Sequence, residues 1–149
     1  MHALTSLSLK YVLPAVLIGA LTVGAGLSTV HAGAGQDAII AKLAGEAKAA
    51  DAAFAGFDEK RGKAFFLATQ TTGKPETPSC STCHGKDPKK AGQTRVGKTI
   101  AAMAVSVTPD RFTDPEKVAK WFTRNCNNVV GRECTALEKG DFVTYMTGE

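Results

Sequence analysis

Five consecutive residues, Cys80-Ser81-Thr82-Cys83-His84, restrict the possible folds of this chain more than any other part of the sequence. Two cysteines separated by two residues and followed directly by histidine form the attachment pattern of c-type haem. On a helical turn, residues three apart lie on the same face, so both thiols can reach the same porphyrin edge. The next residue can then bind the iron, which is the usual role of a proximal histidine. We therefore expect one covalent haem c, attached through Cys80 and Cys83 and bound by His84.

Three other interpretations of the motif fit the sequence less well. A zinc site needs a second ligand pair of suitable spacing, but Cys126 and Cys134 are eight residues apart and two of the three histidines precede residue 33. A thioredoxin-like redox pair needs a βαβ context, and the sequence shows none. A disulfide within the motif leaves its histidine unexplained. Random placement of four cysteines and three histidines would give about 0.002 such motifs in 149 residues.

Residues 1–32 have the pattern of a cleaved signal peptide. Lys10 supplies a positive charge, residues 11–26 are almost entirely apolar, and residues 30–32, Val-His-Ala, offer a cleavage site. An uncleaved membrane anchor is the alternative, but the apolar run is near the lower limit for spanning a bilayer and contains three glycines. We expect export to the periplasm, where disulfides can form, and no stable membrane insertion after cleavage.

Removal of the leader leaves residues 33–149, a length suited to one small domain. This part has 17 basic and 14 acidic side chains, a formal charge of +3. Such a charge is too small to predict nucleic acid binding. It is compatible with transient docking on an acidic redox partner.

The mature chain has the pattern of an all-α domain. Helices are predicted over residues 36–54, 58–69, 115–125 and 135–146, from apolar residues at helical spacing and from two capping boxes. The first of them belongs to an N-terminal helical extension over residues 33–56. Helices at both ends of the mature chain resemble the class I cytochrome c arrangement, which implies that the first and last helices cross beside the haem.

The helix over residues 115–125 contains candidate residues for the other side of a haem. Val118, Trp121, Phe122 and Asn125 follow one helical stripe, so we expect Trp121 and Phe122 to contact the haem. Asn125 ends the stripe and should point inward, where an amide needs a polar partner. As a cap of the helix end, Asn125 would have a purely structural role, and the residues alone favour the cap because asparagine caps are common.

Methionine is the usual sixth ligand of a haem that carries electrons. Met103 follows His84 by 19 residues and is a candidate for this position. A buried methionine more often fills gaps in a core. The residues alone leave the choice of sixth ligand open.

Three segments resemble one small family of c-type cytochromes. They are residues 78–85 (Pro-Ser-Cys-Ser-Thr-Cys-His-Gly), residues 108–114 (Thr-Pro-Asp-Arg-Phe-Thr-Asp) and residues 124–134 (Arg-Asn-Cys-Asn-Asn-Val-Val-Gly-Arg-Glu-Cys). The family is that of the oxygen-binding, high-spin cytochrome called sphaeroides haem protein. The resemblance covers about residues 57–145. It implies that Asn125 coordinates ferric iron and that Cys126 and Cys134 form a disulfide.

The resemblance also implies a function, electron transfer and gas binding rather than enzymatic turnover. An amide oxygen is a weak, hard ligand that suits ferric better than ferrous iron, so reduction should release Asn125 and let O₂ or NO bind. Electrons would come from another cytochrome, of the multihaem c-type or membrane b-type. The alternatives are a conventional electron carrier ligated by His84 and Met103, and a haem peroxidase or oxidase, for which the mature chain lacks a second histidine.

Overall fold

The computed structural model describes residues 33–149, so the predicted signal peptide lies outside the described residues. Their elements, in chain order, are α1 (Ala34–Ala50), α2 (Glu59–Leu67), α3 (Ser81–His84), β1 (Gly92–Gln93), β2 (Thr99–Ile100), α4 (Pro115–Val129) and α5 (Ala136–Gly148). The two short strands pair antiparallel. The predicted all-α class is confirmed. No helix in this part of the chain combines the length and the apolar character needed to cross a bilayer.

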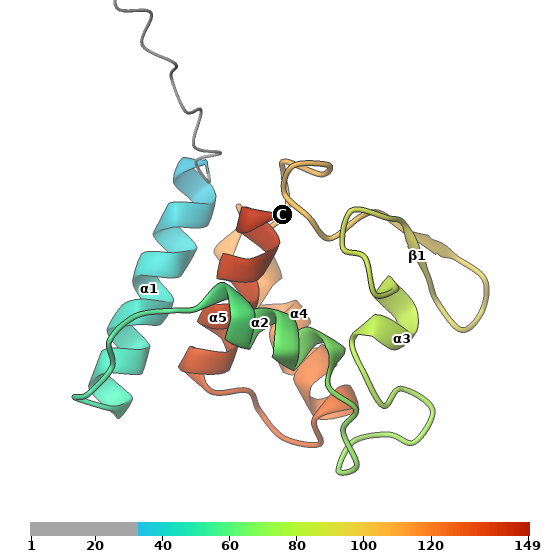
Figure 1. The fold of residues 1–149 in the computed structure, drawn as a ribbon, viewed down its shortest axis with the longest axis horizontal. Helices are drawn as coiled ribbons and strands as arrows, with labels where there is room; N and C mark the ends of the chain where they lie inside the picture. The colour runs from blue at the N-terminus through green and yellow to red at the C-terminus, as the bar shows by residue number, and fades with distance from the viewer. Residues whose placement is uncertain (1–32) are drawn as a thin grey trace, which may run out of the picture.

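The C-terminal helix α5 forms the centre of the core, and both α1 and α2 pack against it (Figure 1). Where α2 meets α5, Gly62 leaves room for the backbone of the other helix, because a Cβ here would overlap the carbonyl oxygen of Asp141. Phe66, one turn further along α2, is fully buried, and its ring lies 6.1 Å from that of Tyr145. Gly62 and Phe66 therefore share the buried face of α2.

Helix α1 buries Ile39, Leu43 and Ala47, and these residues form the apolar stripe that the sequence predicted. The helix ends at Ala50 and not at residue 54 as predicted. Asp51 adopts an extended conformation, and its carboxylate accepts a hydrogen bond of 2.9 Å from the N–H of Ala53. An aspartate that bonds to the backbone two residues later forms a turn, which explains the earlier end.

Helix α4 begins where the sequence predicted, with Asp114 as its cap and Pro115 in the first turn. The capping box predicted between Thr113 and Glu116 is wrong, because Asp114 alone caps the helix. The Asp114 carboxylate accepts hydrogen bonds from the N–H groups of the second and third helical residues. The helix continues to Val129, one turn beyond the predicted end at residue 125. Asn125 therefore lies inside the helix, and the role as a terminal cap, which the residues alone favoured, is wrong.

The buried face of α4 differs from the prediction. Cys126 and Val129 are buried and Phe122 is half-buried, whereas Trp121 is 48% exposed and Asn125 is exposed. Against the rest of the chain, α4 buries positions 126 and 129 and half-buries positions 118 and 122, so the Val118 and Phe122 part of the predicted stripe is confirmed. Trp121 and Asn125 lie together on the neighbouring flank at i,i+4 spacing, and their role toward a haem stays a prediction.

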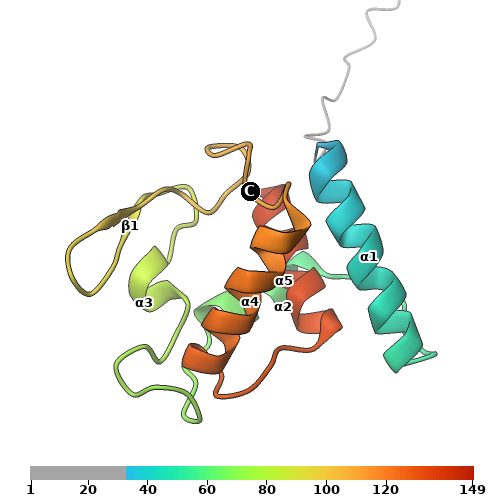
Figure 2. The same cartoon turned by 180° about the vertical axis from the view of Figure 1, so that it is seen from behind.

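Helix α5 begins at the predicted capping box, in which Thr135 and Glu138 each accept a hydrogen bond from the other's backbone N–H. Seen from either side, α1 and the β1–β2 hairpin lie at opposite ends of the molecule (Figures 1 and 2). The predicted haem motif, on α3, lies beside the hairpin.

Candidate haem site

Helix α3 is a single turn that carries the Cys-x-x-Cys-His motif. Its backbone closes through hydrogen bonds from His84 N–H to Cys80 O, 3.2 Å, and from Gly85 N–H to Ser81 O, 2.9 Å. It ends at Gly85, whose φ of +72° suits a residue without a Cβ. Cys80 and Cys83 are both free and half-buried. The alternative of a disulfide between them is absent from the structure.

Two neighbouring elements hold α3 in place. The buried Ser79 hydroxyl donates to Phe66 O at the end of α2, 3.3 Å, and accepts from Ser81 N–H, 3.1 Å. On the other side, a Cβ at Gly92 would overlap the carbonyl oxygen of Cys83, so the β1 strand lies directly against the helix. The motif is therefore held by contacts on two sides, as a precisely placed cofactor requires at its attachment point.

The first thiol of the motif lies where two apolar clusters meet. One cluster surrounds Phe66 and Met146, and the other contains the two remaining cysteines with Val129 and Val130. Cys80 contacts both clusters, as do Phe65 and Phe122. Burial raises the pKa of the Cys80 thiol to about 11. The structure thus brings Phe122, a predicted haem contact, to the same apolar region as the attachment thiol.

The imidazole of His84 is held in its neutral form. Burial, and to a smaller extent the positive charge of Arg111, lowers its pKa to about 4. Within residues 33–149 its buried Nδ1 atom has no hydrogen-bond partner. Neutral imidazole is the form that binds metal ions.

These donors fit a covalently attached haem. The two unpaired thiols of the motif would supply the atoms for two thioether bonds, and the adjacent neutral imidazole would supply a nitrogen ligand to the iron. A zinc ion would need about four such ligands. Residues 33–149 contain no group of three or more His, Cys, Asp or Glu side chains placed to hold a metal ion.

The two candidate sixth ligands occupy different environments. Asn125 has an exposed side chain, and its amide makes no hydrogen bond within the described part of the chain. On the same flank, the Trp121 ring lies 5.3 Å from the Arg124 guanidinium. Met103 is only 7% exposed and belongs to the apolar cluster around Phe66 and Met146.

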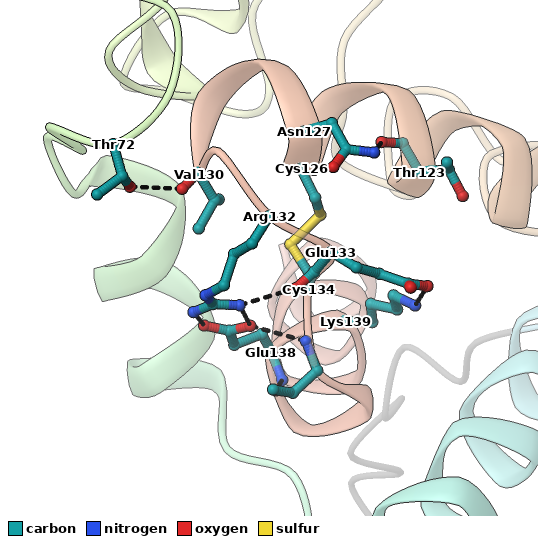
Figure 3. Close-up of a disulfide and its surroundings, with 11 residues drawn as sticks. Thr72, Thr123, Cys126, Asn127, Val130, Arg132, Glu133, Cys134, Glu138 and Lys139 are labelled. Atoms are coloured by element: carbon teal, nitrogen blue, oxygen red, sulfur yellow. Dashed lines mark hydrogen bonds and ion pairs between the residues drawn. A yellow bond between two sulfur atoms is a disulfide. The ribbon is translucent and has the colours of Figure 1, made fainter.

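A disulfide between Cys126 and Cys134 joins the end of α4 to the segment before α5 (Figure 3). This is the pairing that the family resemblance implied. Both cysteines are buried, and the loop between them turns at Gly131, where φ is +75°. After the turn, the Arg132 guanidinium donates two hydrogen bonds to the Glu138 carboxylate, 2.6 and 2.8 Å. The segment that follows Asn125 is therefore fixed at both ends.

The loop that precedes the haem motif is bound to this disulfide loop. The Thr72 hydroxyl donates to Val130 O, and the Lys74 N–H donates to Asn128 O at 2.7 Å. Between these bonds, a Cβ at Gly73 would overlap the carbonyl oxygen of Val129. The backbone leading to Cys80 and the backbone following Asn125 thus form one packed unit.

Sequence reasoning missed several residues that position the site. Ser79 and Gly92 support the motif, Arg111 places a charge near His84, and Gln36 on α1 bonds to the backbone at Arg111. Arg111 lies in one of the three segments that resemble the cytochrome family. That resemblance is the only feature of the sequence that points to any of these residues. The other contacts join residues far apart in the chain, and no local pattern reveals them.

Comparisons with known proteins are consistent with a haem attached at this site. The family described as Domain of unknown function (DUF1924) matches residues 52–146. Cytochrome c-type protein SHP of Cereibacter sphaeroides is 58% identical over 98 residues, covering 66% of this chain and 76% of SHP. Cytochrome c'' of Methylophilus methylotrophus is 37% identical over 89 residues, covering 59% of this chain and 62% of that protein.

Two solved structures of c-type cytochromes also resemble this chain. The structure of oxidised SHP, described as an oxygen-binding cytochrome c, superposes with a TM-score of 0.69 and 52% identity, covering 74% of this chain and 94% of SHP. Oxidised cytochrome c'' gives a TM-score of 0.65 and 31% identity, covering 75% of this chain and 92% of the other. Because both the family match and the similarity to SHP include the motif on α3, the chain belongs to the DUF1924 family as a small monohaem c-type cytochrome and carries one covalent haem c.

Proposed function

We propose that this cytochrome is exported to the periplasm, accepts electrons from another cytochrome, and binds O₂ or NO when reduced. His84 would bind the iron permanently, and Asn125 would bind it only in the oxidised state. The observation that carries the proposal is the 58% identity to SHP, whose solved structure is described as that of an oxygen-binding cytochrome c. The haem would supply a one-electron redox centre that could also bind a small ligand.

The environment of Asn125 supports its role as a reversible ligand. Its amide has no hydrogen-bond partner among residues 33–149, so binding to iron would break no existing bond. Cys126 follows directly, and the disulfide fixes the backbone there. A weak neutral ligand benefits from such pre-organisation, because little conformational entropy is lost on binding. Release of the amide on reduction would then be a movement of the Asn125 side chain.

The environment of Met103 argues against the conventional alternative. Its side chain packs in the apolar cluster around Phe66 and Met146, and its own N–H donates to Pro88 O at 2.8 Å. A methionine buried in this way more often fills the core than binds a metal ion. Asn125, by contrast, has an exposed side chain.

Absorption spectra of the oxidised and reduced proteins, recorded with and without CO, test the proposal. The reduced wild-type protein should be high-spin and should bind CO. Asn125→Ala should change the ferric spectrum, because the sixth ligand is lost, and should leave the ferrous spectrum nearly unchanged. Asn127→Ala is the matched control, since Asn127 is an exposed amide of the same helix that donates to Thr123 O, and its spectra should equal those of the wild type.

Two outcomes contradict the proposal. A low-spin ferrous protein that does not bind CO would indicate methionine ligation, and Met103→Leu should then abolish that spectrum. Asn125→Ala spectra identical to those of the wild type in both oxidation states would remove Asn125 from the mechanism. The export part has its own test: the mass and N-terminal sequence of protein from the periplasmic fraction should correspond to residues 33–149 with one haem.

A further inference from the structure

The segment that follows the haem motif, residues 86–98, carries the net positive charge of the protein. It contains five basic side chains and one acidic one, whereas the rest of residues 33–149 contains 12 basic and 13 acidic side chains. The five basic residues are all exposed, and we call them the basic patch: Lys86, Lys89, Lys90, Arg95 and Lys98. The segment leads into the β1–β2 hairpin, at the end of the molecule opposite α1 (Figures 1 and 2). The charge is therefore concentrated at one end of the molecule.

Nearby carboxylates neutralise the basic patch only in part. Three of its members form ion pairs at the surface: Lys89 with Glu149 (3.0 Å), Arg95 with Glu76 (3.5 Å) and Lys90 with Asp87 (3.8 Å). Five cations and three carboxylates leave the patch with a net charge of +2. Ion pairs in contact with water are weak, so carboxylates of another protein can replace the ones present here.

An apolar side chain stands among these cations. Val96 is 90% exposed, more than any other large hydrophobic residue of the described part of the chain. It lies at the tip of the hairpin, between Arg95 and Lys98, and hydrogen bonds from Thr94 N–H to Lys98 O, 2.8 Å, and from Lys98 N–H to Thr94 Oγ1, 3.0 Å, hold the tip in shape. Protein interfaces have this arrangement, an apolar centre within a charged rim. A bilayer surface gains little from a single valine, because membrane binding scales with the buried apolar area.

The basic patch lies against the haem motif. Lys86 follows His84 by two residues, and β1 rests on α3, where a Cβ at Gly92 would overlap the carbonyl oxygen of Cys83. In haem, the vinyl groups that become thioethers lie on the half of the ring opposite the two propionates. The patch would therefore adjoin the thioether edge of the haem and not its negatively charged edge. A protein bound to the patch would approach the haem where it is attached to the chain, and a short distance favours electron transfer.

We propose that the basic patch is the docking surface for the redox partner of this cytochrome, and that the partner presents carboxylates around its own redox centre. The inference rests on the part of the proposed function in which electrons come from another protein, and it is independent of Asn125 and of gas binding. In the step, the partner loses one electron and is oxidised, and the ferric haem gains that electron and becomes ferrous. Attraction between the two surfaces raises the association rate, and salt weakens it. Val96 then contributes to the complex at short range.

The test uses flavodoxin, a small acidic protein whose reduced flavin donates single electrons, as the probe. Anaerobic stopped-flow measurements follow the ferric haem-containing protein as flavodoxin hydroquinone reduces it and becomes the semiquinone. At low ionic strength, the double variant Lys86→Glu, Lys98→Glu should lower the second-order rate constant about tenfold, and Val96→Thr should lower it about twofold. The control Lys42→Glu, Lys48→Glu makes the same charge change on the exposed surface of α1 and should lower it less than about twofold. Photoreduced lumiflavin, which is uncharged, should reduce every variant within about 1.5-fold of the wild-type rate.

Carbodiimide cross-linking of the wild-type ferric protein to flavodoxin gives a second readout, which does not depend on electron transfer or on any variant. The reagent joins lysine amines to carboxylates, and peptide mapping should locate the bonds at lysines of the basic patch. Cross-links at Lys117 or Lys120 of α4, or no cross-link at all, would overturn the inference. An equal loss of rate in the two double variants, or a wild-type rate that does not fall with added salt, would overturn it as well.

A membrane surface is the other possible occupant of the basic patch. Vesicles of equal parts phosphatidylcholine and phosphatidylglycerol test it by co-sedimentation. Binding that the variant Lys86→Glu, Lys98→Glu loses, without cross-links of the wild type to flavodoxin, would replace the redox partner by a bilayer and overturn the inference. A changed ferric spectrum in Asn125→Ala, combined with a wild-type flavodoxin rate in Lys86→Glu, Lys98→Glu, would support the proposed function while refuting the docking surface.

Discussion

Gly62 of α2 lies against the carbonyl group of Asp141 of α5, so closely that the two helices could not meet in this way around any larger residue. The contact is between backbones, which cannot move aside as a flexible side chain can. It sets the distance between α2 and α5, and α2 in turn holds the haem motif through the bond from Ser79 to Phe66. The position of the haem motif thus depends on residue 62 being glycine.

Gly62→Ala should therefore destabilise the protein strongly. The added Cβ would overlap backbone atoms, and we expect a loss of about 3 kcal/mol or more in the free energy of unfolding, at the upper end of overpacking effects. Gly45→Ala is the matched control, because a Cβ at this exposed position of α1 meets nothing within 4 Å. It should stabilise by about 0.5–1 kcal/mol through helix propensity. Chemical denaturation of both variants measures the difference, and equal stabilities would show that α2 can shift without cost.

All four cysteines of the mature protein should be unreactive. Cys80 and Cys83 are expected to be in thioether bonds, and the other two form the disulfide. Alkylation of the denatured protein without reductant should label no thiol, and alkylation after reduction should label two. One labelled cysteine before reduction would contradict either the haem attachment or the disulfide, and peptide mapping would show which.

Loss of the disulfide should lower stability. The bond closes a loop of about nine residues, for which the chain-entropy model gives about 2.5 kcal/mol. The double variant Cys126→Ser, Cys134→Ser should lose at least this amount, because two hydroxyl groups are also buried. Reduction of the wild-type protein provides the comparison without a change of sequence. A loss below about 1 kcal/mol in both would mean that the bonds from Thr72 and Lys74 hold the loop without the disulfide.

Glu138 should contribute to the acid sensitivity of the fold. Hydrogen bonds from Arg132, and then from the Thr135 N–H, hold the pKa of Glu138 below its ordinary value. A carboxyl whose pKa is lower in the folded state adds stability above the unfolded pKa of about 4.3, and this stability is lost as the pH falls through the folded pKa. Solvent screens the half-exposed Arg132, so the contribution is about 1 kcal/mol or less.

Glu138→Gln isolates this contribution, because glutamine keeps the capping box and removes the charge. The variant should be less stable than the wild type at pH 7, and the two should approach each other below about pH 4. Glu46→Gln, in an exposed i,i+4 pair with Lys42, is the control and should change stability by less than about 0.5 kcal/mol. Unfolding curves measured from pH 3 to 7 give the difference in stability between each variant and the wild type. Parallel pH profiles for Glu138→Gln and the wild type would contradict the assignment.

Local sequence signals determined much of the architecture. The starts of α4 and α5 follow from Asp114, Pro115 and the Thr135–Glu138 capping box, because caps use side chains within three residues of the backbone they bind. The haem motif on α3 is local for the same reason, since attachment chemistry requires a fixed spacing. The disulfide was different: its pairing came from the resemblance to a family, because spacing alone does not select a partner.

The tertiary structure alone decided which face of α4 is buried and which residues surround His84. The predicted stripe packs against the rest of the chain through Val118 and Phe122, and the helix runs one turn further and buries Cys126 and Val129 on the same face. The contacts of Gln36 and Arg111 span more than 70 residues and leave no periodic trace in the sequence. A sequence specifies such contacts only through the complete packing of the chain, so the charge near His84 becomes visible only once the helices are assembled.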